Sequence, residues 1–135
     1  MGIKKILIVD DEADMRVFVS TVVETMGLDP IPAQDGVEAL KKARTVRPDL
    51  IVLDVMMPKI EDGIRTYHQF KTENNLTDIP IIMLSAIAKR TFFHSLRMLS
   101  PQKDEVIPEP EAYMEKPPDA EMLTGLIKSF LSIGG

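Results

Sequence analysis

Four apolar runs in this 135-residue sequence each end at a residue type that can do chemistry. The run ILIV is followed by Asp10 and Asp11, and the run LIVL is followed by Asp54. Two later runs end at Ser85 and at Lys116. A carboxylate at the exit of a buried strand is costly unless something uses its charge. Three acids, a hydroxyl and a lysine therefore indicate a site for a metal ion and a phosphoryl group.

The residue types of this site suggest which chemistry it performs. Asp10, Asp11 and Asp54, if crowded together, would repel one another and raise at least one pKa unless a cation holds them. Oxygen ligands suit Mg²⁺, which readily shares its ligand shell with a phosphate. One carboxylate could then attack phosphorus and form an acyl phosphate. Lys116 and Ser85 are the pair available to neutralise and position the phosphoryl oxygens.

The elements that must position these residues alternate between strands and helices. Strands are predicted at residues 3–9, 28–33, 50–53, 79–84 and 112–115. The second of them belongs at a sheet edge if it forms, because Pro30 and Pro32 cannot donate to a ladder. Helices are predicted at residues 13–26, at residues up to 46 that follow a cap at Asp35, and at 63–71. A fourth helix is predicted after residue 85, with Phe92, Leu96 and Leu99 on one apolar stripe, and a fifth after residue 119.

Strands that alternate with helices predict an α/β sheet covered on both faces, because crossovers between parallel strands are right-handed. In such open sheets, ligands bind beyond the carboxyl ends of the strands. All the residues singled out above lie at such ends. This shared position, more than any single residue, predicts a functional site there.

Composition limits the classes of function. The length and the 44% hydrophobic content fit one compact domain over residues 1–135. A net charge of -5 without a basic cluster argues against direct nucleic-acid binding. The absence of cysteine excludes disulfides and thiolate metal sites. No stretch is apolar enough to span a bilayer and the N-terminus has no signal-peptide organisation, so we expect a cytoplasmic protein without a membrane partner.

The whole chain resembles a receiver domain of two-component response regulators, with the architecture of the stand-alone chemotaxis regulators. The segments that carry the resemblance are ILIVDD at 6–11, DLIVLDVMMP at 49–58, PIIMLSA at 80–86 and YMEKP at 113–117. The resemblance implies a three-layer, flavodoxin-like (βα)5 fold whose parallel five-stranded sheet has the order 2-1-3-4-5. The sequence is compatible either with a stand-alone receiver or with an excised domain.

The resemblance also implies a metal-dependent phosphoacceptor. Asp54 would accept the phosphoryl group, and Asp10 and Asp11 would hold Mg²⁺ together with Asp54 and the backbone carbonyl of Met56. The phosphoryl group would come from a phosphohistidine on a sensor histidine kinase or a phosphotransfer protein. Such a protein is a signalling phosphoprotein, not an enzyme, and it catalyses only its own phosphotransfer and dephosphorylation.

Three further positions match the part of the family's site that responds to phosphorylation. Ser85 would bind a phosphoryl oxygen, Lys116 would pair with the phosphoryl group, and Tyr113 would turn inward when the hydroxyl moves. The bond to Pro117 is expected to be cis. Phosphorylation would then switch the surface around the fourth helix, fifth strand and fifth helix for a downstream protein target, or for a homodimer.

Two departures from the family pattern lead to further expectations. Ser85 and Lys116 lie 31 positions apart, and the surplus falls in an extended loop at about 100–112, far longer than an ordinary connection. We hypothesise that this loop remodels partner or dimer recognition. Met56 and Ile87 are apolar residues expected near the phosphorylation site, and they cannot orient an attacking water. Slow self-dephosphorylation is therefore expected.

Other interpretations of the same residues remain open. Asp10 and Asp11 could have no role beyond capping the first helix, and Tyr113 could be an ordinary strand aromatic. A receiver-like interaction module that works without phosphorylation would typically lack an acid or the lysine, and none is missing here. A haloacid-dehalogenase-type phosphatase needs a second Asp two residues after its nucleophile, where this chain has Met56 or Glu12. A flavin carrier is disfavoured because DDEADM would repel a phosphate.

Overall fold

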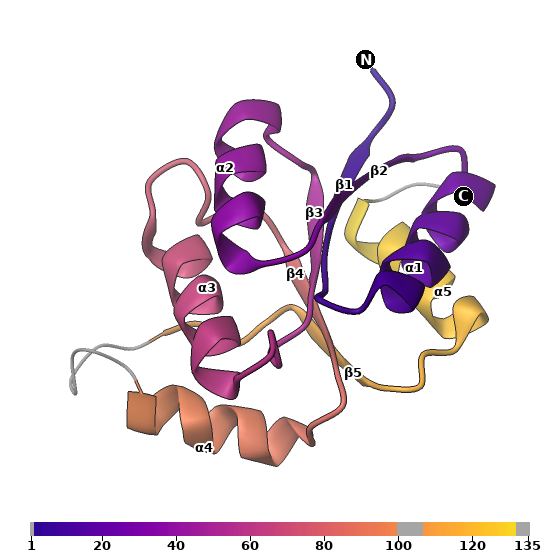
Figure 1. Ribbon diagram of the computed structural model, residues 1–135. Coiled ribbons are helices and arrows are strands. Elements are labelled where there is room, and N and C mark those ends of the chain that lie inside the picture. The colour runs from indigo at the N-terminus through magenta and orange to yellow at the C-terminus, as the bar shows by residue number, and fades with distance from the viewer. Residues whose placement is uncertain (1, 100–106, 132–135) are drawn as a thin grey trace.

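The computed structural model describes residues 2–99 and 107–131, within which five strands alternate with five helices (Figure 1). The strands are β1 (Lys5–Val9), β2 (Asp29–Ala33), β3 (Leu50–Leu53), β4 (Ile81–Ser85) and β5 (Ala112–Glu115). The helices are α1 (Ala13–Thr25), α2 (Gly36–Val46), α3 (Ile60–Thr72), α4 (Lys89–Leu99) and α5 (Ala120–Leu131). All neighbouring strands pair in parallel in the order β2-β1-β3-β4-β5. The predicted fold class and strand order are confirmed.

The sheet is buried on both faces, which explains why its inner strands are continuously apolar. Along β1, Leu7 and Val9 join one hydrophobic cluster, whereas Ile6 and Ile8 join the other. The proline-containing β2 lies at the sheet edge, as its sequence requires.

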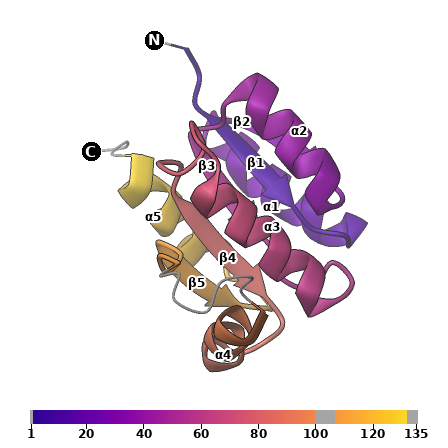
Figure 2. The same cartoon turned by 90° about the vertical axis from the view of Figure 1, so that its left-hand side faces the viewer.

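Helices complete a three-layer arrangement. α1 and α5 pack on one face of the sheet, and α2 and α3 pack on the other (Figures 1 and 2). α4 contributes Phe92 and Leu96 to the same cluster as α2 and α3. Each connection therefore returns the chain to the edge of the sheet where the strands begin, so the carboxyl ends of all five strands meet at the opposite edge.

Helix α2 illustrates how local sequence sets an element's ends. The Asp35 carboxylate accepts a hydrogen bond from the backbone N–H of Glu38 at 2.8 Å, as the predicted cap requires. The Glu38 carboxylate in turn accepts from the backbone N–H of Gln34 at 2.9 Å. The helix ends at Arg47, which has a left-handed conformation with φ of 54° immediately before Pro48.

Several predicted features differ from the structure, and the first is strand β1, which begins at Lys5 and not at residue 3. Helix α3 begins at Ile60 and not at Gly63, because the acidic residues Glu61 and Asp62 form its first turn. Strand β4 begins at Ile81 and not at residue 79. Leu99, expected on the apolar stripe of α4, is 43% exposed because it lies at the last residue of the helix, beyond the contacts of Phe92 and Leu96.

The long connection before β5 is described only in part. Residues 107–111 precede β5 without regular secondary structure, and residues 100–106 of the predicted loop lie outside the described residues. The single-domain organisation and the recognition role of this loop stay predictions. In the part of the chain that the structure describes, no helix has both the length and the apolar character needed to cross a bilayer.

Candidate functional site

The sheet's hydrogen bonds continue past the strand ends and fix the residues that follow. The backbone N–H of Asp54 donates to the carbonyl of Val9 at 2.9 Å. At the other side of the sheet, the backbone N–H of Lys116 donates to the carbonyl of Ser85 at 2.8 Å. Strand register thus positions the backbone of Asp54 and of Lys116.

These strand ends gather four carboxylates. Asp10 and Asp54 are buried, with 3% and 2% of their surfaces exposed, whereas Asp11 and Glu12 face solvent. One carboxylate oxygen from each of the four lies within 4.8 Å of the others. The structure therefore brings together the three acids that the sequence analysis singled out.

Lys116 lies among these acids. Its Nζ atom is 3.0 Å from Oδ2 of Asp10, 3.2 Å from Oδ2 of Asp54 and 2.9 Å from Oε1 of Glu12. The other oxygen of each buried acid accepts a backbone N–H two residues further on, from Glu12 at 2.9 Å and from Met56 at 3.1 Å. Each buried carboxylate is therefore oriented on one side by its own loop and on the other by the lysine.

Burial and mutual repulsion raise the pKa values of the buried acids. Burial, together with the neighbouring charge of Asp10, raises the pKa of the Asp54 carboxyl to about 6. Burial also raises the pKa of Asp10. Burial disfavours the Lys116 ammonium, but its hydrogen bonds with Glu12 and Asp10 outweigh that effect and raise the pKa of Lys116. The lysine is therefore charged, and one positive charge faces four acids.

This donor set fits a divalent cation. Carboxylate oxygens are hard ligands of the kind that Mg²⁺ prefers, and few protein ligands are needed because Mg²⁺ keeps several waters. The four carboxylates can carry more negative charge than the single ammonium of Lys116 neutralises, so the cluster can attract a cation. Two buried carboxylates at one position are costly without such a partner.

The predicted hydroxyl and aromatic residues lie together beside β4. Ser85 is fully buried, and its Oγ lies 3.4 Å from the backbone nitrogen of Ile87. The Tyr113 hydroxyl donates to the carbonyl of Ile87 at 2.8 Å and lies close to the Ser85 side chain. Burial raises the pKa of Tyr113 to about 12, so its hydroxyl keeps its proton. The bond between Lys116 and Pro117 is cis.

The sequence analysis did not include two residues that the structure adds to the site. Glu12 contacts Lys116, as described above, and the Arg16 guanidinium donates to the backbone carbonyl of Asp10 at 2.7 Å. Glu12 could have been identified from its position directly after Asp10 and Asp11. Arg16 could not, because its contact depends on the angle at which α1 leaves the sheet.

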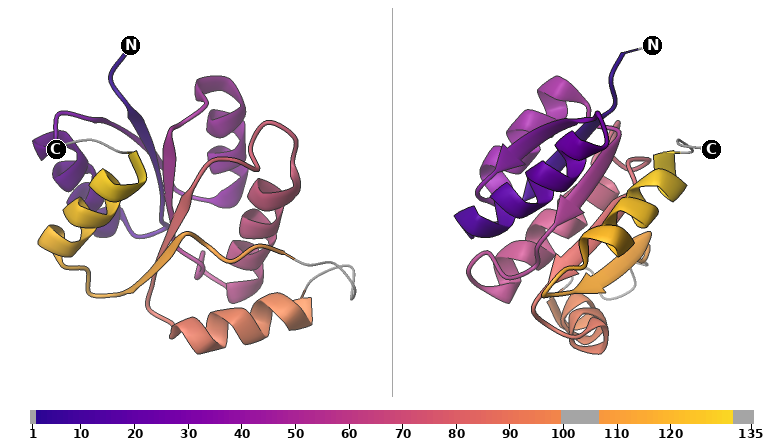
Figure 3. Two further views of the ribbon diagram at one scale, coloured as in Figure 1. Left: turned by 180° about the vertical axis from the view of Figure 1, so that it is seen from behind. Right: turned by 90° about the vertical axis from the view of Figure 1, so that its right-hand side faces the viewer.

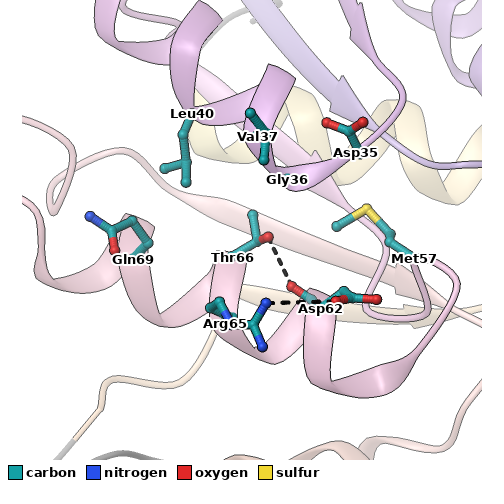
Figure 4. A pocket seen from close by; sticks show the side chains of 9 residues that line it. All are labelled: Asp35, Gly36, Val37, Leu40, Met57, Asp62, Arg65, Thr66 and Gln69. Carbon is teal, nitrogen blue, oxygen red and sulfur yellow. Dashed lines mark hydrogen bonds and ion pairs between the residues drawn. The ribbon is translucent and has the colours of Figure 1, made fainter.

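A separate hollow of about 350 Å³ lies between α2 and α3 (Figure 4). On its α3 side, the Thr66 hydroxyl donates to the carbonyl of Asp62 at 2.9 Å, and Arg65 lies 3.7 Å from the Asp62 carboxylate. The two helices approach closely here, because a Cβ atom on Gly36 would lie 2.0 Å from Oγ1 of Thr66. This hollow does not include the carboxylate cluster.

Comparison with known protein families assigns the chain to one of them. The model of the response regulator receiver domain matches residues 6–110, a range that includes Asp10, Asp11, Asp54 and Ser85. The chain belongs to this family. The predicted recognition is thereby confirmed, and the protein is a receiver domain of response regulators.

Curated relatives of this receiver domain differ in how much of their length it spans. It is 51% identical over 83 residues to the alkaline phosphatase synthesis transcriptional regulatory protein PhoP of Bacillus subtilis, covering 62% of this chain and 33% of the relative. The chain thus spans about a third of the length of the first of these relatives. It is 32% identical over 125 residues to protein PilG of Pseudomonas aeruginosa, covering 93% of this chain and 85% of PilG.

Solved structures show the same architecture. Chemotaxis protein CheY4 of Vibrio cholerae superposes with a TM-score of 0.78 at 26% identity, covering 96% of this chain and 99% of that one. A receiver domain protein from Methanospirillum hungatei, described as CheY-like, has a TM-score of 0.78 at 23% identity, covers 97% of this chain and 95% of that one, and supports the fold alone.

Proposed function

We propose that this receiver domain accepts a phosphoryl group on Asp54, in a Mg²⁺-dependent reaction, from a phosphohistidine on a sensor histidine kinase or a phosphotransfer protein. The observation that carries the proposal is the placement of one buried carboxylate, Asp54, within reach of three further acids and of the Lys116 ammonium at 3.2 Å. A nucleophile, a cation site and a fixed positive charge are what phosphoryl transfer requires.

The transfer is a displacement at phosphorus. A carboxylate oxygen of Asp54 forms a bond to phosphorus while the bond between phosphorus and the histidine nitrogen of the donor breaks. The imidazole leaves with the electron pair of that bond and takes a proton from solvent. Asp54 reacts as the carboxylate, which its backbone contact with Met56 and its contact with Lys116 keep oriented.

The residues that would hold Mg²⁺ are Asp10, Asp11 and Asp54, with the backbone carbonyl of Met56. Bound there, the ion would neutralise the phosphoryl oxygens and lower the repulsion between them and the carboxylates. Lys116 contributes a second positive charge at the same place. Its position among the acids supports a role in pairing with a phosphoryl oxygen.

Ser85 and Tyr113 are proposed to report the phosphoryl group to the rest of the molecule. The Ser85 hydroxyl would turn to a phosphoryl oxygen and move away from the Tyr113 hydroxyl. The inward position of Tyr113 beside Ile87 would then be favoured. The surface around α4, β5 and α5 would change accordingly and bind a downstream protein target or a second copy of the domain.

The proposal is tested by intact mass measurement after incubation with acetyl phosphate, with and without Mg²⁺. The native chain is expected to gain a single phosphate only when Mg²⁺ is present. Asp54→Asn should gain none, because the nucleophile is absent. Asp78→Asn, at an exposed aspartate in the connection before β4, serves as the matched control and should behave as the native chain does.

The opposite result would favour another function for the same fold. A native protein that binds Mg²⁺ yet forms no adduct would support a receiver-like interaction module that works without phosphorylation. An adduct that persists in Asp54→Asn would place the acceptor elsewhere.

A further inference from the structure

Residues 107–111, which we call the strap, lead into β5 beside α3 (Figure 3). The Glu111 carboxylate accepts hydrogen bonds from the Lys71 ammonium at 2.9 and 3.1 Å and from the backbone N–H of Ile81 at 2.7 Å. The backbone N–H of Glu111 donates to the Ile81 carbonyl at 3.0 Å. The Tyr67 hydroxyl donates to the carbonyl of Pro108. The strap is therefore fastened to α3 and to the start of β4.

Lys71 is a buried charge that the proposed phosphotransfer does not use. Only 3% of its side chain is exposed, and its ammonium lies 5.9 Å from the centre of the Tyr67 ring. A buried ammonium is strongly unfavourable without a partner, so the Glu111 carboxylate must stay in place. The position of the strap and the position of Tyr67 are fixed by the same group of contacts.

A row of aromatic rings runs from this fastening to the phosphorylation site. Tyr67 packs edge-on against Phe92, with ring centres 5.4 Å apart and planes at 85°. Phe92 is fully buried and packs against Tyr113, with ring centres 5.6 Å apart. Tyr113 is the residue whose hydroxyl meets Ile87 and Ser85. The strap is thus connected to the proposed switch by continuous contacts.

We propose that the strap clamps the switch: by fixing Tyr67 and Phe92 it holds Tyr113 inward, so that the fastened strap and a phosphoryl group on Asp54 favour one another. This inference rests on the proposed function and adds a regulatory element to it. The coupling must be reciprocal, because it is a free energy shared by two sites.

The direction of the coupling follows from what holds Tyr113. When Ser85 turns to a phosphoryl oxygen it moves away from Tyr113, whose inward place then depends on its hydrogen bond to the Ile87 carbonyl and on the Phe92 ring. Packed rings adopt discrete arrangements and do not deform continuously. A fastened strap keeps Phe92 in the arrangement that Tyr113 needs. An unfastened strap lets Tyr67 and Phe92 repack and leaves Tyr113 free to turn outward.

Two variants of the full chain unfasten the strap in different ways. Glu111→Gln keeps an acceptor for the Ile81 N–H but removes the charge that faces Lys71. Tyr67→Phe keeps the ring against Phe92 but removes the hydrogen bond with Pro108, and as a nearly isosteric change it tests the coupling even if Glu111→Gln folds poorly. Binding of beryllofluoride with Mg²⁺, a stable mimic of the phosphoryl group, is measured by calorimetry. Both variants should bind it about fivefold more weakly or worse.

The matched control is Glu73→Gln, which makes the same chemical change at another acid that contacts its own basic partner, Arg44, at 2.7 Å. Glu73 caps the end of α3 and is not part of the strap or the aromatic row. Its variant should bind beryllofluoride as the native chain does. Beryllofluoride should also slow hydrogen exchange at the Glu111 amide of the native chain.

Two results would overturn the clamp alone. The first is that both strap variants bind beryllofluoride as tightly as the native chain does, even if Glu111→Gln lowers thermal stability. A loss of stability without a change in affinity would mean that the strap has a structural role only. The second is an unchanged exchange rate at Glu111 in the beryllofluoride complex. A native chain that binds no beryllofluoride would instead overturn the proposed function, and the clamp with it.

Discussion

Burial of the Asp54 carboxylate comes at a cost to the folded state. It is 2% exposed, it faces the charge of Asp10, and one lysine is shared among the acids of the cluster. The result is a pKa raised from 3.8 to about 6. Without a divalent cation, ionisation of this carboxyl therefore opposes folding.

Replacing Asp54 with Asn should stabilise the metal-free protein at pH 8. The carboxyl binds its proton more tightly in the folded than in the unfolded state, so native stability falls as pH rises from about 4 through about 6. One pKa unit corresponds to about 1.4 kcal/mol, and the loss of the charged contact with Lys116 offsets part of the gain. We expect Asp54→Asn to add about 1–2 kcal/mol to the free energy of unfolding in urea with a chelator present.

The gain should shrink toward zero at about pH 3, where the carboxyl is largely protonated in both states. Asp78→Asn, at an exposed position, should change the free energy of unfolding little at either pH. An Asp54→Asn protein that is less stable than the native chain at pH 8 would show that Lys116 more than compensates the burial of Asp54.

The lifetime of the proposed acyl phosphate depends on two apolar neighbours. Met56 and Ile87 are both half-buried and present no group that could orient a water for attack. Slow loss of the phosphoryl group is expected, and Met56→Asn should accelerate it about tenfold or more by adding a polar group. The decay of the phosphorylated mass with time measures this rate.

Met98→Asn is the control for this prediction, because Met98 is 70% exposed on α4. Its phosphoryl half-life should match that of the native chain. A native half-life of seconds would contradict the expectation.

The contacts of some single residues could be predicted from the sequence, and those of others could not. Asp10, Asp54 and Lys116 could be placed together because each follows a buried strand of a parallel sheet, whose ends meet at one edge. The pairing of Lys71 with Glu111 could not be predicted. It joins positions 40 residues apart, and in the sequence Lys71 reads as an ordinary exposed helix residue.

At the scale of elements, helix α3 is held directly against the loop that carries the proposed phosphoacceptor. A Cβ atom on Gly63 would lie 1.7 Å from the carbonyl oxygen of Val55, the residue after Asp54. The absence of a side chain at Gly63 is therefore required for this helix to pack where it does. The approach also transmits any shift of α3 to the site.

Gly63→Ala should displace this loop, because backbone atoms cannot yield as a side chain would. We expect the free energy of unfolding to fall by about 3 kcal/mol, and the affinity for Mg²⁺ to fall with it. Urea unfolding and Mg²⁺ titration measure the two effects separately.

Gly125→Ala makes the same change in helix α5, where a Cβ atom meets nothing within 4 Å. It should raise stability by up to about 1 kcal/mol, because Ala is the better helix former. Equal effects of the two substitutions would contradict the role given to the contact between Gly63 and Val55.

The elements that the sequence predicted well are those with strong local signals. The strand at 50–53 is continuously apolar, and the helix cap Asp35 is followed three residues later by the acid Glu38. Both elements occur where predicted. The start of α3 was misplaced because Lys59 caps it without a side-chain hydrogen bond. The exposure of Leu99 depends on where α4 ends, which periodicity alone does not specify.

At the scale of the whole molecule, the receiver fold separates the reaction from the response. The carboxylate cluster lies at the ends of β1 and β3, whereas the strap lies at the opposite ends of β4 and β5, where these strands begin. The row from Tyr113 through Phe92 to Tyr67 crosses between them. Under the proposed clamp, residues 107–111 give this receiver a second place at which its proposed switch can be biased.

The most direct test of the central claim is to locate the phosphoryl group. The chain is incubated with acetyl phosphate and Mg²⁺ and then treated with borohydride, which reduces an aspartyl phosphate to homoserine. Peptide mass spectrometry should find homoserine at position 54 and at no other aspartate, and none when Mg²⁺ is withheld. Aspartate that remains intact at position 54, or homoserine at Asp10 or Asp11, would contradict the account of Asp54 as the phosphoacceptor.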